Sequence, residues 1–200
     1  DPMAAGAGTH TITYTYTDGN GCVNSASDDV EVFALPVVSF TALADLCIDA
    51  GVQAAQGGGT PAGGTYSGPG VTDNGDDTYD FDPAAAGLGV HTITYDYTDM
   101  NGCSGSASDD VEVFDLPVVE LETEDYHCLT ADIQMLPMTG GSPAGGVYSG
   151  VGITDNGDGI SYFIDPTVNG EGLVTVTYTY TDMNGCTSSA TSDIEVVDCG

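Results

Sequence analysis

A twelve-residue segment occurs three times in this chain and limits its possible folds more than any other feature. The copies read TITYTYTDGNGC from Thr11, TITYDYTDMNGC from Thr92 and TVTYTYTDMNGC from Thr175. Apolar or aromatic residues alternate with threonines, which is the period-2 pattern of a strand with one buried face. The Asn-Gly pair after each strand is typical of a type I′ hairpin turn, so we expect the chain to return as the next strand.

The spacing of the three copies predicts tandem modules. Their cysteines, Cys22, Cys103 and Cys186, lie 81 and 83 positions apart, a period that favours small repeats over one large domain. We expect the second half of a module at residues 1–34, a complete module at 35–115 and another at 116–200. Because three strands bury too little surface to stand alone, the front half of the first module is expected upstream or on another subunit.

Each complete module is expected to be an all-β immunoglobulin-like sandwich. Short strand patterns separated by Gly-rich and Asp-rich turns occur about seven times in roughly eighty residues, which is the strand count of that fold. No segment of the sequence has a helical pattern.

The charge composition argues against several classes of partner. The chain has 31 acidic residues and no lysine or arginine. Such a chain does not neutralise phosphates, so nucleic acids and anionic membrane surfaces are not expected as partners. No run of 18 apolar residues occurs, so membrane insertion is not expected. Like charges oppose compaction unless cations gather, and bound divalent ions would offset this repulsion.

No catalytic constellation is found, and we do not expect an enzyme. The carboxylate pairs Asp28-Asp29 and Asp109-Asp110 alternate across a strand, so their members point to opposite faces and do not share a substrate. No serine or cysteine has a histidine in a recurring relation to it.

The acidic turns carry a resemblance to known repeats. One turn reads DNGDG from Asp155, followed by Tyr162 and Asp165-Pro166, and the other reads DNGDDTYDFDP from Asp73. This order resembles the filamin-type immunoglobulin repeat. The T-D-x-N-G-C strand ends are similar to the immunoglobulin-like and PKD-like tandem repeats of large secreted surface proteins in gliding and biofilm-forming bacteria. The resemblance covers both complete modules and the partial one, and implies an extracellular location at a bacterial surface or matrix.

The six cysteines lack zinc-binding spacing and indicate disulfides in an exported protein. In the filamin-like strand order, the favoured bridges join the second strand of a module to the start of its last strand, as Cys47–Cys103 and Cys128–Cys186. The alternative bridges would staple neighbouring modules, as Cys22–Cys47 and Cys103–Cys128. The favoured scheme leaves Cys22 and Cys199 to find partners elsewhere.

The same strand order implies a calcium site at each joint between modules, because calcium accepts six to eight oxygen ligands in irregular geometry. The expected ligands are Asp1, Asp73, Asp76 and Asp99 at the first joint, and Asp82, Asp155, Asp158 and Asp182 at the second. Two other readings stay open: Asp-Asn-Gly-Asp segments are ordinary turn formers, and the carboxylates also attract diffuse counterions.

We therefore expect a structural segment of an extracellular bacterial fibre or stalk, stabilised by calcium and in contact with neighbouring repeats or copies of itself. The alternative is a surface adhesin module that binds a glycan or protein ligand. Fold resemblance alone does not decide between them.

Overall fold

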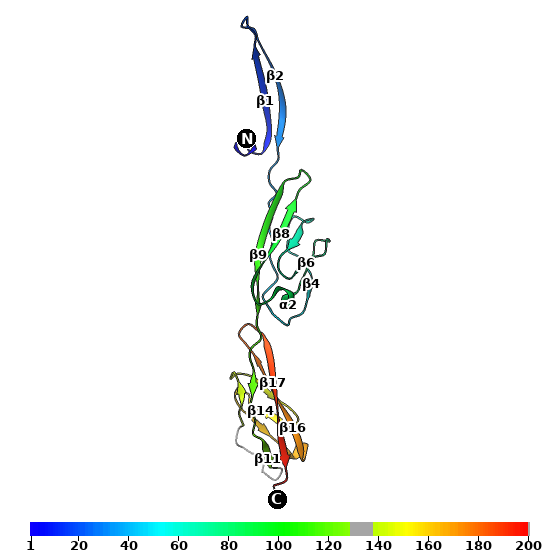
Figure 1. Ribbon diagram of the computed structural model, residues 1–200, viewed down its shortest axis with the longest axis vertical. Helices are drawn as coiled ribbons and strands as arrows, with labels where there is room; N and C mark the ends of the chain where they lie inside the picture. The colour runs from blue at the N-terminus through cyan, green and yellow to red at the C-terminus, as the bar shows by residue number, and fades with distance from the viewer. Residues whose placement is uncertain (129–137, 200) are drawn as a thin grey trace. The chain divides into compact units, whose positions relative to one another are not determined.

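The computed structural model describes residues 1–128 and 138–199, and it confirms the predicted all-β fold class (Figure 1). In chain order, the strands of the first part are β1 (Gly8–Thr17), β2 (Val23–Val32), β3 (Leu46–Cys47), β4 (Gln53–Gln56), β5 (Thr65–Ser67), β6 (Val71–Asp73), β7 (Tyr79–Phe81), β8 (Gly89–Thr98) and β9 (Ser104–Phe114). The later strands are β10 (Glu120–Leu121), β11 (Tyr126–Cys128), β12 (Gly141–Ser142), β13 (Val147–Ser149), β14 (Ile153–Asp155), β15 (Tyr162–Ile164), β16 (Gly172–Thr181) and β17 (Thr187–Val197).

The chain divides into two compact units. The first comprises residues 1–44, 52–86 and 90–111, and the second comprises residues 45–51, 87–89 and 112–200. The module limits predicted from the repeat, at 34/35 and 115/116, stay a prediction.

The first unit has its core on the paired strands β8 and β9. Its strands pair in the order β9-β8-β5, and a second sheet has the order β4-β7-β6. β3 pairs with the last two residues of β9, and these residues belong to the second unit. β5 pairs antiparallel with β8, which places Tyr66 opposite Tyr95. The buried side chains of this unit alternate along their strands, as the period-2 pattern predicts; they are Tyr66, Tyr79, Phe81, Ile93, Tyr95 and Val111.

The second unit repeats this arrangement. Its four-stranded sheet has the order β11-β17-β16-β13, and shorter sheets pair β14 with β15 and β10 with β12. Tyr148 on β13 lies opposite Tyr178 on β16, as Tyr66 lies opposite Tyr95. One cluster forms the core, made of Tyr148, Tyr162, Ile164, Val174, Val176, Tyr178, Ile194 and Val196.

The expectation that no helix forms is wrong at three places. α1 (Pro2–Ala5), α2 (Pro83–Ala86) and α3 (Pro166–Asn169) are single turns, each preceded by an aspartate. Asp1, Asp82 and Asp165 each accept a hydrogen bond through Oδ1 from an amide in the first turn, at 3.0 Å. An aspartate cap followed by proline at the first helical position starts a helix without any helical periodicity.

The hairpin turns also differ from the type I′ prediction. In β1–β2, the amide of Gly21 donates to the carbonyl of Asp18 at 3.0 Å, and the amide of Asp18 donates to the carbonyl of Cys22 at 2.9 Å. Gly21 has φ of 85°, whereas Asn20 does not have positive φ. A type I turn followed by a left-handed glycine closes a three-residue loop. Gly21 is therefore the one residue of the Asn-Gly pair that adopts the left-handed conformation.

Candidate functional site

The disulfides join cysteines in a pattern that corrects both predicted schemes. Cys47 is bonded to Cys186, and Cys128 is bonded to Cys199. Cys22 and Cys103 are free thiols. The prediction that the chain contains disulfides is confirmed, whereas the pairs Cys47–Cys103, Cys128–Cys186, Cys22–Cys47 and Cys103–Cys128 are wrong.

Strand direction explains why the favoured pairs do not form. β3 runs parallel to β9, with Cys47 opposite Phe114, whereas Cys103 precedes the other end of β9. The eleven residues of β9, from Ser104 to Phe114, span about 36 Å when extended. A disulfide needs its two Cα atoms within about 7 Å, so Cys103 lies too far from Cys47. β11 repeats this geometry against β17, with Cys128 opposite Val197. Cys199 follows Val197 by two residues, so it lies within reach of Cys128.

The Cys47–Cys186 bridge connects residues of two sequence repeats. Its Cα atoms are 5.6 Å apart and its sequence separation is 139 residues. Both cysteines belong to the second compact unit. A short strand from the predicted module 35–115 is therefore held covalently to the β16–β17 hairpin of the next repeat.

The carboxylates predicted to bind calcium act as hydrogen-bond acceptors in local turns. Asp99 and Asp182 each accept from two backbone amides of their own hairpin loop at 2.9 Å. Asp76 accepts from the amide and hydroxyl of Thr78. Asp1 and Asp82 cap helices, as described above. These contacts are the turn chemistry that was the competing reading of the acidic segments.

Asp73 and Asp155 play one further structural role, because each joins its turn to a neighbouring strand. Asp73 Oδ1 accepts from the amide of Tyr66 at 3.2 Å, and Asp155 Oδ1 accepts from the amide of Tyr148 at 3.0 Å. Asp158 accepts from the hydroxyl of Ser161 at 2.5 Å. This hydrogen bond, together with the amide of Ile160, lowers the pKa of the Asp158 carboxyl, because hydrogen bonds to a carboxylate favour its ionised form.

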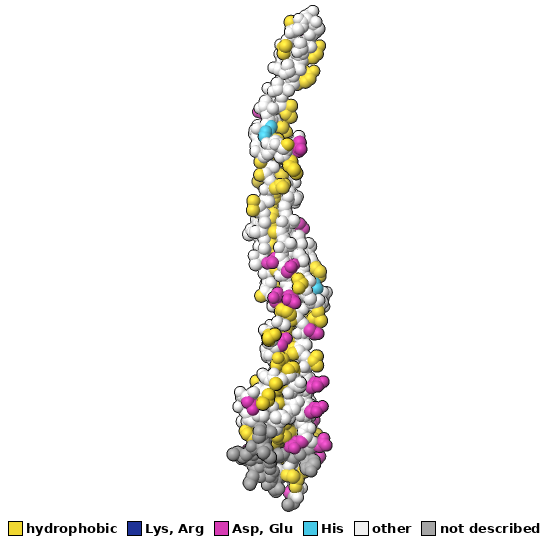
Figure 2. Space-filling view, turned by 90° about the vertical axis from the view of Figure 1, so that its left-hand side faces the viewer, with side chains coloured by type: hydrophobic (Ala, Val, Ile, Leu, Met, Phe, Trp, Pro, Cys, Tyr) yellow, Lys and Arg dark blue, Asp and Glu magenta, His cyan; other side chains and the backbone are white. Residues whose placement is uncertain are grey.

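Neither compact unit forms a calcium site by itself among its described residues. Over residues 1–128 and 138–199, no three His, Cys, Asp or Glu side chains are placed together so as to hold a metal ion. The donors therefore do not fit a calcium cage within a unit, and the convergence of carboxylates from neighbouring modules stays a prediction. Figure 2 shows acidic side chains at many separate positions of the face in view.

A buried tyrosine held by a glycine-rich loop, which we call the tyrosine cradle, forms once in each unit and was not predicted from the sequence. The Tyr95 hydroxyl accepts from the amide of Gly64 at 2.8 Å and donates to the carbonyl of Pro61 at 2.5 Å. A side chain at Gly59 or Gly64 would collide with the ring of Tyr95. The second unit repeats these contacts around Tyr178, with the Gly146 amide at 2.8 Å and the Pro143 carbonyl at 2.5 Å.

The sequence signal for this cradle is the segment GGxPAGG, which begins at Gly58 and again at Gly140. By composition alone, the first copy resembles any of the Gly-rich turns expected between strands. The segment recurs at a spacing close to the module period, and in both copies two of its glycines pack against the ring of the tyrosine in the repeated strand.

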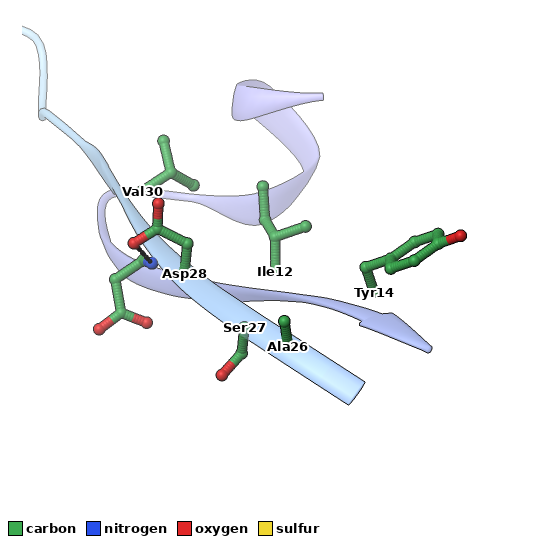
Figure 3. A pocket seen from close by; sticks show the side chains of 7 residues that line it. Ile12, Tyr14, Ala26, Ser27, Asp28 and Val30 are labelled. Carbon is green, nitrogen blue, oxygen red and sulfur yellow. Dashed lines mark hydrogen bonds between the residues drawn. The ribbon is translucent and has the colours of Figure 1, made fainter. Parts of the chain in front are cut away.

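The β1–β2 hairpin presents the same apolar face without a cover. Ile12, Tyr14 and Val30 expose 64%, 69% and 44% of their surface. They line a shallow depression together with Ala26 and Asp28 (Figure 3). The residues 81 positions later, Ile93, Tyr95 and Val111, are fully buried. The apolar face of the hairpin is therefore a candidate interaction surface of the first unit.

Comparisons with known proteins give distant structural likeness only. No protein-family model matches the chain, and no curated protein matches it in sequence. An ice-binding, Ca²⁺-stabilised adhesin of an Antarctic bacterium is 16% identical with a TM-score of 0.45; the match covers 98% of this chain and 58% of the adhesin. The N-terminal eight immunoglobulin domains of the Down syndrome cell adhesion molecule are 11% identical with a TM-score of 0.43, covering 93% of this chain and 35% of that one.

Mouse protocadherin-24 is 12% identical with a TM-score of 0.32, and the match covers 95% of this chain and 79% of that one. We draw no functional assignment from likeness at this level. Among the described residues, no helix has the length and hydrophobicity needed to cross a membrane.

Proposed function

We propose that this chain is a structural segment of an extracellular bacterial fibre or stalk built from tandem immunoglobulin-like repeats. The observation that carries the proposal is the Cys47–Cys186 disulfide, which ties one sequence repeat to the next. A bridge of this kind has little use in a module that acts alone. It is useful in a chain that must stay continuous under tension.

The bridge also stabilises the fold substantially. Closing a loop of 139 residues restrains the unfolded chain by about 5 kcal/mol in the loop-entropy model. This is comparable to the whole stability of a small domain. Since the chain has no lysine or arginine, it lacks the ion pairs with those residues that other surface proteins use, and covalent links take on more of the stabilisation. Disulfides of this kind persist outside the reducing cytosol.

Calcium is proposed as a second stabilising factor. The formal net charge of −31 opposes compaction, and divalent ions near the acidic turns reduce that repulsion. The support for this proposal is the net charge of the chain. The geometry of the turns does not add to it, because the turn carboxylates accept hydrogen bonds within their own loops.

Single-molecule stretching of the full chain, held by tags at its two ends, tests the structural role. With disulfides intact, the 139 residues between the bridged cysteines are shielded from force, so full reduction is expected to lengthen the stretched chain by about 480 Å. A Cys103→Ser variant is the matched control and should behave as the wild type, because Cys103 is a free thiol. Equal extension before and after reduction would refute the proposal.

A second candidate is a surface adhesin module that binds a glycan or protein ligand. The uncovered apolar face of the β1–β2 hairpin favours it, since exposed apolar surface marks binding sites. A glycan array and a pull-down with surface proteins would separate the two roles. Saturable binding of one glycan that survives substitution of the bridge cysteines would favour the adhesin.

A further inference from the structure

Among residues 1–128 and 138–199, no strand pairs with either edge of the β1–β2 hairpin. β1 and β2 form a two-stranded sheet by themselves. In the first unit, the equivalent strand β8 pairs with β5 along Thr94–Asp96. The equivalent strand β9 pairs in parallel with β3 at Val113 and Phe114. By the 81-residue equivalence, the open edges lie at residues 13–15 of β1 and at Val32 and Phe33, where β2 ends.

The polar groups on this face, the Asp28 carboxylate and the Tyr14 hydroxyl, also indicate what kind of segment would cover it. Asp28 lies opposite Ile12 and shares its face. Its counterpart Asp109 accepts a hydrogen bond from the amide of Ala42 at 3.1 Å. The counterpart of Tyr14 is Tyr95, whose hydroxyl is held by the GGxPAGG segment. An apolar ligand of no particular shape would leave both groups unused.

We propose that the β1–β2 face is a docking site for the front half of an immunoglobulin-like repeat that lies outside residues 1–200 and has the pattern of residues 37–83. The docked segment adds one strand antiparallel to residues 13–15, with a tyrosine opposite Tyr14. It adds a second, parallel strand at residues 32–33, and its GGxPAGG loop covers the Tyr14 ring. This inference does not depend on the fibre role.

The choice of occupant follows from the chain itself. Both other copies of this face are covered by segments that carry GGxPAGG followed by a Tyr-Ser-Gly strand, and both use the same two hydroxyl contacts. Main-chain pairing at an open edge provides affinity, and side-chain pockets provide specificity. The β1–β2 hairpin and residues 37–83 are both acidic and have no lysine or arginine, so their charges repel each other. Apolar contact must therefore drive the association, and added salt strengthens it because it screens the repulsion.

The test uses the full 200-residue chain and a labelled synthetic peptide of residues 37–83 carrying Cys47→Ser. Fluorescence anisotropy is expected to show saturable binding that tightens as sodium chloride is raised. Tyr14→Ser should weaken binding by at least about tenfold, as expected for an aromatic anchor. Thr17→Ser, on the face of β1 opposite to that of Tyr14 and outside residues 13–15, is the matched control and should leave affinity unchanged within about twofold.

A second pair of variants tests the geometry of the cover. A peptide with Gly64→Val should not bind, because a side chain there collides with the tyrosine ring. A peptide with Thr72→Ser, at an exposed position outside the GGxPAGG loop, should bind normally. Circular dichroism checks that Tyr14→Ser retains the wild-type fold. Absence of saturable binding, equal binding to Tyr14→Ser, or a dimer of the chain alone that Tyr14→Ser dissolves would each overturn the proposal. Either result leaves the stretching experiment interpretable on its own.

Discussion

Two buried tyrosines in the second unit should respond in opposite ways to the same substitution. Tyr178 and Tyr162 are both fully buried in one cluster, and both rings pack against Tyr148 at 4.6 Å between centroids. The Tyr178 hydroxyl makes two hydrogen bonds, to the Gly146 amide and the Pro143 carbonyl. The Tyr162 hydroxyl is buried without a hydrogen-bond partner among the described residues.

The expected magnitudes follow from these contacts. Tyr178→Phe keeps the ring but leaves a buried amide and carbonyl unpaired, which costs about 2 to 3 kcal/mol. Tyr162→Phe removes a hydroxyl that was desolvated without compensation, so it should raise stability by about 1 kcal/mol. The difference between the two variants is therefore about 3 to 4 kcal/mol, although both lose one oxygen atom from the same core.

Urea unfolding of the oxidised full chain, followed by far-ultraviolet circular dichroism, measures this difference. The comparison uses the shift of the transition midpoint at unchanged slope, which reports stability and not a change in the denatured state. Both substituted rings keep their contact with Tyr148, so the two variants differ little in ring packing. If Tyr162→Phe loses as much stability as Tyr178→Phe, the assignment of the hydroxyl contacts is wrong.

Three further predictions concern pH, thiols and calcium. Burial raises the pKa of Tyr162 to about 12; since an unfolded tyrosine ionises near pH 10, its contribution is complete below about pH 10 and falls by about 2 to 3 kcal/mol between pH 10 and 12. That fall should be missing from Tyr162→Phe in urea midpoints measured across this range. A thiol reagent should modify two cysteines per native chain, Cys22 and Cys103, and six after reduction and unfolding; modification of Cys47 in the oxidised native chain would contradict the bridges. Calcium should raise the melting temperature more than sodium chloride of equal ionic strength, and equal shifts would mean that charge screening alone is at work.

The sequence predicted the strand pattern well because its signal is local. Alternation of Ile, Tyr and Thr marks one face of each strand, and the buried residues Ile93, Tyr95 and Tyr178 lie on that face. The Asp-Gly-rich turns and the existence of disulfides were also readable from residue type alone. The three helical turns were missed, although the signal was present: each begins at the proline of an Asp-Pro pair.

The sequence by itself therefore determined that this chain is an all-β protein, because a period of two residues is a property of the strand backbone. Only the tertiary structure decided the disulfide partners, since parallel pairing of β3 with β9 places Cys47 at the end of the strand away from Cys103. It likewise decided that Tyr95 is enclosed while Tyr14, whose sequence neighbours differ only by Thr15 in place of Asp96 over residues 11–18, is exposed. Burial depends on which segment covers a strand, and the strand's own residues do not encode that.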